Sequence, residues 1–218
     1  VLRGRGGYCF EQNALFEAAL RALGFAVRPL LARVWLENPQ ETPPATHQLE
    51  LVEIDGADWI ADAGFGGSFT PPMPLAEGEG PAAPDGALHR LRRDERFGWM
   101  LERRGPVAPA DGRAGEAPEW QRQYSFTTAP AYPADLATSN HWTSTRPGTR
   151  FTSLVVASQV TEDGFVSLTN RALRISGGAD KGDVLLEDAQ ALRQALRTHF
   201  GIALDEDEAE TLFARGRG

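Results

Sequence analysis

The stretch Arg5-Gly6-Gly7-Tyr8-Cys9-Phe10-Glu11-Gln12-Asn13 holds the only cysteine of the chain and leads into a run of helix-forming residues that extends to Leu23. The paired glycines allow close approach of the backbone, and Gly24 is a natural helix stop in the left-handed conformation. The pattern predicts a helix that begins at or near Cys9. Helical spacing predicts an inward face that contains Cys9, Phe16, Leu20 and Leu23.

The composition of the chain excludes several classes of protein. Its 218 residues allow one compact domain or a few small subdomains, and 30 Asp+Glu against 22 Lys+Arg argue against nucleic acid as a partner. No apolar run approaches the roughly 20 residues that span a bilayer, so we expect no membrane partner. One cysteine excludes both an intramolecular disulfide and a cysteine-rich zinc site. Together with the lack of a signal-peptide pattern, this predicts a cytoplasmic location.

The single thiol has two interpretations. A lone cysteine is most often a small buried apolar residue. A cysteine at a helix N-terminus can instead be a nucleophile, because the helix dipole and the free N–H groups stabilise a thiolate. Catalysis of this kind also needs a base, usually histidine, and a third group that holds the histidine in the correct tautomer.

His47 is the best candidate base and Asp62 the best orienting carboxylate. Strands are predicted over 46–54 and 59–63, and Asp55-Gly56 between them is a hairpin signal. His47 and Asp62 are nearly symmetric about this turn, so the hairpin alone can bring them together. The alternatives are a half-exposed strand histidine for His47 and a turn or capping residue for Asp62.

Gly64-Phe65-Gly66-Gly67-Ser68 follows Asp62 directly. Consecutive glycines expose backbone N–H groups that can bind an anion, such as the phosphates of a cofactor. A plain tight turn is the alternative, because this is neither a Walker A motif nor a dinucleotide fingerprint. No pair among the four histidines has the spacing of metal ligands, so no metal is expected.

The remaining elements are predicted from hydrophobic periodicity and turn residues. Helix, antiparallel strands, then strands and helices is an order that indicates an α+β fold rather than a βαβ series. The additional strands are expected over 25–36, 89–93, 97–103, 120–126, 151–159, 165–169 and 172–176, and the additional helices over 132–139, 185–200 and 206–215.

These residues resemble the arylamine N-acetyltransferase family of prokaryotic type. The matching blocks are Arg5 to Asn13, His47-Gln48-Leu49 with Val52, Asp62-Ala63-Gly64-Phe65-Gly66-Gly67, and Asn140 through Phe151-Thr152. The resemblance runs over most of the chain, and the first and third blocks together are highly specific. Members have a helical segment of several dozen residues before the first block, so the resemblance implies that this chain lacks it.

The resemblance implies a cysteine-proteinase-like fold in three parts. Residues 1–24 would be the end of an N-terminal helical domain that carries the nucleophile. Residues 25–130 would form an antiparallel β-barrel, and residues 131–218 an α/β lid.

The function implied by the resemblance is ping-pong acetyl transfer, typical of xenobiotic metabolism. Acetyl coenzyme A would acetylate a cysteine, which would pass the acetyl group to an arylamine, a hydrazine or an arylhydroxylamine. Cys9 would be the nucleophile, His47 the base and Asp62 the orienting carboxylate, supported by Arg5, Glu11 and Asn13. Coenzyme A contacts are expected at Thr46, Gly66, Gly67 and Thr149, and acceptor contacts at Phe65, Phe69 and Phe151.

Other readings of the same residues stay open. Related amide synthases that close macrolactams, and transglutaminase-like hydrolases, also use a cysteine, a histidine and an aspartate. A non-catalytic binding module is a further alternative, against which the presence of all three residues argues. Self-association into a homo-oligomer is also left open.

Overall fold

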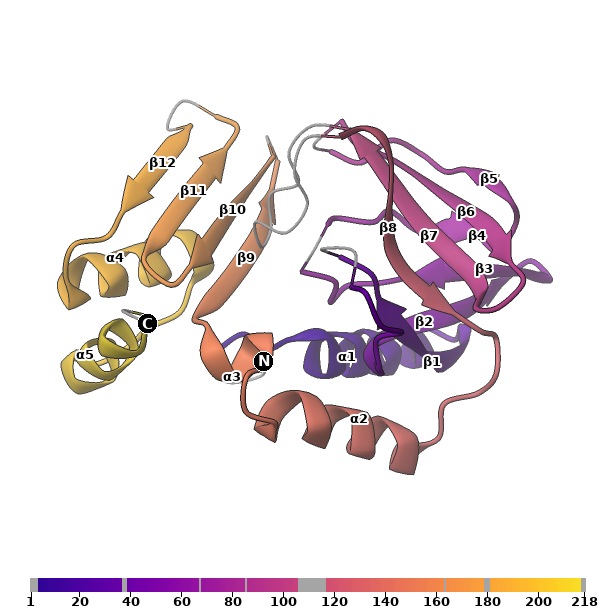
Figure 1. The fold of residues 1–218 in the computed structure, drawn as a ribbon, viewed down its shortest axis with the longest axis horizontal. Helices are drawn as coiled ribbons and strands as arrows, with labels where there is room; N and C mark the ends of the chain where they lie inside the picture. The colour runs from indigo at the N-terminus through magenta and orange to yellow at the C-terminus, as the bar shows by residue number, and fades with distance from the viewer. Residues whose placement is uncertain are drawn as a thin grey trace.

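The computed structural model describes residues 4–36, 39–66, 68–84, 86–105, 117–162, 164–178 and 181–216. Two antiparallel sheets and several helices make up this part of the chain (Figure 1), which confirms the α+β class. The larger sheet has the order β4-β3-β2-β1-β8-β7-β6-β5, and the smaller one has the order β12-β11-β10-β9.

The elements have the following bounds. The strands of the larger sheet are β1 (Ala26–Val34), β2 (Ala45–Ile54), β3 (Ala57–Ala61), β4 (Met73–Pro74), β5 (Gly78–Glu79), β6 (Leu88–Asp94), β7 (Gly98–Gly105) and β8 (Ala117–Phe126). Those of the smaller sheet are β9 (Val156–Thr161), β10 (Gly164–Thr169), β11 (Ala172–Ser176) and β12 (Gly182–Leu185). The helices are α1 (Cys9–Ala22), α2 (Pro133–Thr145), α3 (Arg150–Ser153), α4 (Ala189–Phe200) and α5 (Glu206–Arg215).

The larger sheet curls into a half-barrel. Its two edge strands, β4 and β5, are separated by only residues 75–77. A Cβ placed on Gly80 would lie 2.8 Å from the Met73 side chain, so the chain approaches itself closely at this corner. The inside is filled by a buried cluster of mostly large apolar residues: Leu30, Ala32, Leu49, Leu51, Ile60, Met73, Leu91, Trp99, Leu101, Tyr124 and Phe126.

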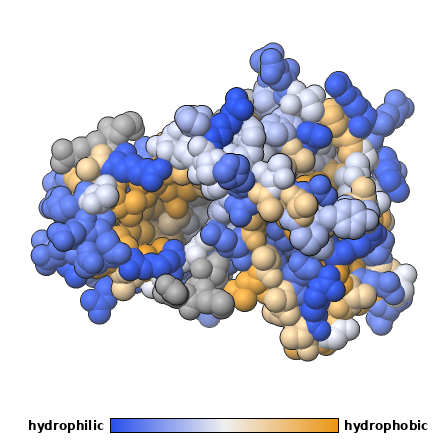
Figure 2. Space-filling model, turned by 90° about the horizontal axis from the view of Figure 1, so that it is seen from below, coloured by the Kyte–Doolittle hydropathy of each residue, from blue (hydrophilic) through white to orange (hydrophobic). Residues whose placement is uncertain are grey.

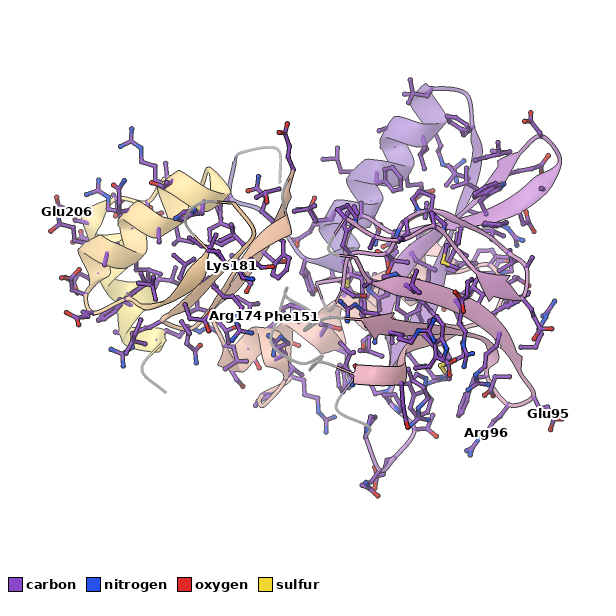
Figure 3. The ribbon with its side chains drawn as sticks, turned by 90° about the horizontal axis from the view of Figure 1, so that it is seen from above. Glu95, Arg96, Phe151, Arg174, Lys181 and Glu206 are labelled. Carbon is purple, nitrogen blue, oxygen red and sulfur yellow. The ribbon has the colours of Figure 1, made fainter. Side chains whose placement is uncertain are left out.

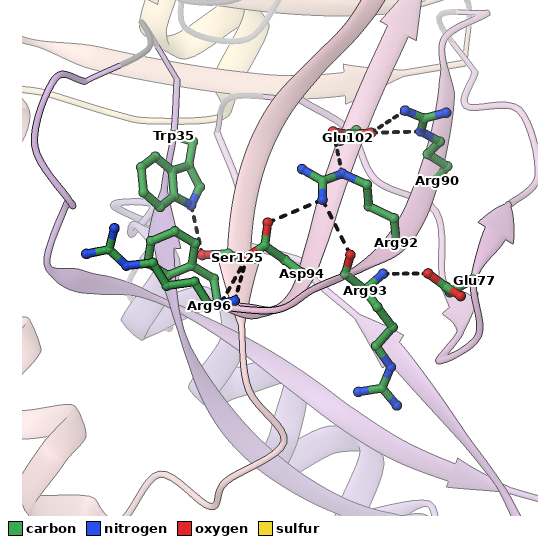
Figure 4. Close-up of polar contacts among 10 residues, drawn as sticks. Trp35, Glu77, Arg90, Arg92, Arg93, Asp94, Arg96, Glu102 and Ser125 are labelled. Atoms are coloured by element: carbon green, nitrogen blue, oxygen red, sulfur yellow. Dashed lines mark hydrogen bonds and ion pairs between the residues drawn. The ribbon is translucent and has the colours of Figure 1, made fainter.

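Strand β8 enters this sheet beside β1, although about 90 residues of chain separate them. Ala32 pairs with Phe126 and Val34 pairs with Tyr124. The Trp35 indole N–H also donates to Ser125 Oγ at 2.8 Å (Figure 4). On β6 and β7, the same figure shows one carboxylate, that of Glu102, which accepts from two arginines. The β1–β8 pairing brings Tyr124 into the core.

The smaller sheet has its own core, in which α4 and α5 pack against the strands. Figure 1 shows this unit beside the half-barrel, with α2 and α3 running below the two. Seen from below, its surface has a hollow lined by hydrophobic side chains within a hydrophilic rim (Figure 2). In the part of the chain with described coordinates, no helix combines the length and the apolar character that a membrane crossing requires.

Most predicted elements are found, with three corrections. Asp55 and Gly56 form the expected tight turn, with φ of 53° and 78°. The predicted strand 151–159 is wrong in its first part, because Thr149, Thr152 and Arg146 satisfy one another's polar groups locally and form a helical turn before β9. Leu23 is 75 % exposed rather than inward. It caps α1 just before the chain reverses at Gly24, while Phe16 and Leu20 do pack inward as predicted.

The third correction concerns the ends of the late elements. The helix expected over 132–139 continues to Thr145, and the one expected over 185–200 begins only at Ala189. Asp188 explains the later start, because its carboxylate accepts from the Ala191 N–H and caps the helix at that point. The four residues 182–185 form an edge strand instead.

A buried carboxyl, that of Glu50, lies between β2 and α1. Its Oε1 accepts a hydrogen bond of 2.9 Å from Gln48, whereas its Oε2 has no partner among the described residues. Burial raises the pKa of Glu50 to about 8, with further increases from the nearby charges of Glu17 and Asp62. Glu50 is therefore neutral in the folded protein at neutral pH.

The free energy of unfolding should fall as the pH rises from about 4.5 to about 8, because folded Glu50 keeps a proton that the unfolded chain loses. This stabilisation is complete below the unfolded pKa and is lost as the pH passes through the folded pKa. Glu50→Gln should flatten that part of the curve, as measured by urea unfolding between pH 5 and pH 9. Glu53→Gln, an exposed change on the same strand, is the control. An unchanged slope in Glu50→Gln would contradict the assignment.

Candidate active site

Cys9 is the first residue of α1 and is almost fully buried. Tyr8 precedes the helix in an extended conformation, and its backbone N–H donates to Glu11 Oε2 at 2.8 Å, which fixes the start of the helix. The Cys9 Sγ lies 3.8 Å from the carbonyl oxygen of Thr46, at the start of β2. The thiol therefore faces the strand that carries His47.

The structure brings His47 and Asp62 together. The His47 Nε2 lies 2.6 Å from Asp62 Oδ2, and both side chains are buried. Pairing of Glu50 with Ala61 in the β2–β3 hairpin explains the contact. It puts Asp62 level with Leu49, two residues from His47 on the same face of the sheet. The half-exposed alternative for His47 is wrong, because the curled sheet covers this face.

Asn13 joins the nucleophile helix to the carboxylate. Its Nδ2 donates to Asp62 Oδ1 at 3.0 Å and to the Gln48 carbonyl at 2.5 Å, and its Oδ1 accepts from the Ala63 N–H at 2.9 Å. Asn13 lies four residues after Cys9, on the same face of α1. The Gly64 N–H donates a further bond of 3.0 Å to Asp62 Oδ1. These contacts hold Asp62 in one orientation.

These contacts and burial determine the protonation of the pair. Burial alone would lower the pKa of His47, but the carboxylate of Asp62 and, less strongly, the thiol of Cys9 raise it to about 10. Burial would raise the pKa of Asp62, but His47, Asn13 and the Gly64 N–H lower it. At neutral pH the pair is an imidazolium and a carboxylate. A buried imidazolium beside a thiol is the environment that stabilises a thiolate.

Tyr124 is a site residue that sequence reasoning missed. It is fully buried, and its ring centroid lies 5.1 Å from that of His47 and 4.9 Å from that of Phe65. Burial, and then the charge of Asp62, raise the pKa of Tyr124 well above its usual value. No local signal in 120–126 pointed to this role, because it depends on the pairing of β8 with β1.

The three predicted acceptor residues have different surroundings. Phe65 is half-buried, and its ring centroid lies 4.9 Å from that of His47. Phe151, on α3, lies 4.8 Å from the ring of Tyr8, which is the neighbour of Cys9. Phe69 is exposed on the loop that follows Phe65. Phe65 and Phe151 thus approach the site from the half-barrel and from α3.

The predicted coenzyme contacts also differ in position. Thr46 lies beside Cys9, and a Cβ on Gly66 would lie 3.9 Å from Ser158 of β9. The glycine loop therefore faces the smaller sheet. The hydroxyl of Thr149 donates to the Thr143 carbonyl at 3.0 Å, near the end of α2. Gly67 lies outside the described residues. Within the described ranges, no group of three or more His, Cys, Asp or Glu could hold a metal ion.

Comparisons with known proteins agree on one family. A match to the N-acetyltransferase family covers residues 1–209. The arylamine N-acetyltransferase of Escherichia coli K12 is 34% identical over 209 residues, which cover 94% of this chain and 70% of that protein. The solved arylamine N-acetyltransferase of Salmonella typhimurium is 32% identical with a TM-score of 0.84, covering 96% of this chain and 76% of that one. The Mycobacterium marinum enzyme in complex with CoA is 31% identical with a TM-score of 0.80, at the same coverages of 96% and 76%.

Proposed function

Because the chain belongs to the arylamine N-acetyltransferase family, we propose that it transfers an acetyl group from acetyl coenzyme A to an arylamine, a hydrazine or an arylhydroxylamine. One observation carries the proposal: a cysteine at a helix N-terminus lies beside a buried histidine that is 2.6 Å from a buried aspartate. The relative solved with CoA supports the choice of donor.

In the first step, the Cys9 thiolate attacks the carbonyl carbon of the thioester. The new carbon–sulfur bond forms, the bond to the coenzyme sulfur breaks, and the departing thiolate takes the proton of the His47 imidazolium. One thioester replaces another, so this step is nearly thermoneutral. Backbone N–H groups at the start of α1, including that of Cys9, would stabilise the oxyanion.

In the second step, the acceptor nitrogen attacks the acetyl-cysteine. Neutral His47 takes the proton from the nitrogen, and Cys9 leaves as the thiolate. An arylamine is neutral at pH 7, so it enters the apolar surroundings of Phe65, Phe69 and Phe151 without losing a charge. Asp62 keeps the imidazole oriented through both steps.

The proposal extends to the donor site and the three-part organisation. Thr46, Gly66, Gly67 and Thr149 would contact coenzyme A between the half-barrel and the smaller sheet, supported by the contact of the glycine loop with β9. Parts 1–24, 25–130 and 131–218 would meet at the site in a cysteine-proteinase-like arrangement. The acidic composition and single cysteine support a cytoplasmic location.

Mass spectrometry of the protein after incubation with acetyl coenzyme A should detect one added acetyl group, on the peptide that contains Cys9. Addition of aniline should remove it and yield acetanilide, because the acetyl-cysteine is an intermediate rather than a dead end. Omission of the donor is the control. Hydrolysis of a peptide without any reaction with acetyl coenzyme A would instead indicate a transglutaminase-like hydrolase and overturn the proposal.

A further inference from the structure

Tyr8 contacts three helices around the proposed nucleophile. It directly precedes Cys9 and α1, while its side chain extends to α2 and α3. The Tyr8 hydroxyl hydrogen-bonds to Asn140 of α2, through both the side-chain oxygen and, at 3.3 Å, the carbonyl oxygen. Its ring meets the ring of Phe151 edge-on, at 4.8 Å and an interplanar angle of 65°. Tyr8 therefore connects Cys9 to the helix that carries Phe151.

The turn that carries Phe151 is held on its other sides by bonds that do not involve the active site. Thr152 Oγ1 donates to the carbonyl of Arg146 at 2.9 Å, and Arg215 of α5 donates to the Thr152 carbonyl at 2.8 Å. Phe151 itself is 37 % exposed, and Figure 3 shows it at the boundary between the two sheet units. Toward Cys9, the printed contact of its ring is with Tyr8.

The hydroxyl of Tyr8 is separable from the geometry of Cys9. The start of α1 is fixed by the Tyr8 backbone N–H and Glu11, which the phenol does not affect. Burial, with the nearby Cys9 and Glu11, raises the pKa of Tyr8 to about 12, so the phenol stays a donor over the usual working range of pH. Loss of the hydroxyl would release Asn140 and loosen Phe151 without moving the thiol.

We propose that Tyr8 is a positioning residue that determines acceptor specificity, because it fixes Phe151 as a wall of the acceptor site next to Cys9. The inference rests on the proposed acetyl transfer and deepens it. Tyr8 would then matter in the step in which the arylamine binds and attacks. It would matter little in the step in which Cys9 takes the acetyl group from the coenzyme.

The test compares the two half-reactions in Tyr8→Phe and in the native protein. The rate of Cys9 acetylation by acetyl coenzyme A should stay within about twofold, while the KM for aniline and for 4-phenylaniline rises by roughly 3- to 10-fold, the range for one lost hydrogen bond. Asn140→Ala should have the same effect, and the double variant should be no worse than either single one. Tyr132→Phe is the matched control, since Tyr132 caps α2 in the same way but is 65 % exposed.

The outcomes separate this inference from the function on which it rests. Equal slowing of both half-reactions in Tyr8→Phe, or an unchanged KM for both amines, would overturn the positioning role. Failure of the native protein to form acetyl-Cys9 would instead overturn the proposed function. Thermal unfolding of each variant shows whether a loss of folding, which would lower both rates together, is responsible for any change.

Discussion

Replacement of Cys9 by alanine is expected to abolish acetyl transfer and leave the fold intact. Cys9 is the only thiol of the chain, so no other residue can form the thioester intermediate. Loss of a covalent nucleophile costs on the order of 10⁴-fold or more in turnover. The helix start should survive, because Tyr8 and Glu11 hold it through a backbone bond that does not involve the sulfur.

The measurement is release of coenzyme A in the presence of aniline, with circular dichroism and thermal unfolding as checks on the fold. Cys9→Ser is a useful companion, since it keeps the size of the side chain and exchanges the thiol for a weak nucleophile. Turnover near that of the native protein in Cys9→Ala would remove Cys9 from its role.

The local parts of the site were predictable from the sequence. Two glycines before a helix-forming run placed Cys9 at a helix N-terminus. The Asp55-Gly56 turn set the approximate register of β2 and β3, and with it the meeting of His47 and Asp62. Both features depend on contacts between residues that are close in the chain, where turn chemistry and periodicity are informative.

The parts that depend on distant contacts were not predictable. Tyr124 reaches His47 only because β8 pairs with β1 across about 90 residues, which no local pattern encodes. Glu50 is polar in an alternating strand and would be expected to face water, but α1 covers that face. Phe151 reads as a strand residue, yet local hydrogen bonds of threonine hydroxyls hold it in a helical turn.

Replacement of Gly64 by alanine should reduce both activity and stability. A Cβ at this position would lie 2.7 Å from the Cys9 Cα, 3.1 Å from the Cys9 carbonyl oxygen and 2.9 Å from the Asn13 Nδ2. Two of these atoms belong to the backbone of the first turn of α1, so they cannot rotate away. Either the helix start or the loop after Asp62 must shift.

A shift of either element would damage the site at two points. The Gly64 N–H donates to Asp62 Oδ1, and Asn13 donates to the same oxygen. Movement of the loop would therefore release the carboxylate that orients His47, and movement of the helix would displace the thiol. We expect the free energy of unfolding to fall by about 1–3 kcal/mol and kcat/KM to fall by about 10²-fold.

Steady-state kinetics, urea unfolding and the rate of Cys9 alkylation by iodoacetamide would measure these effects. Gly182→Ala is the control, because a Cβ there has no heavy atom within 4 Å. If Gly64→Ala alkylates and turns over like the native protein, the close approach of the loop to α1 does not hold the site together. If alkylation and turnover fall together while the control is unaffected, the fit between a glycine and the helix start places the thiol beside its histidine.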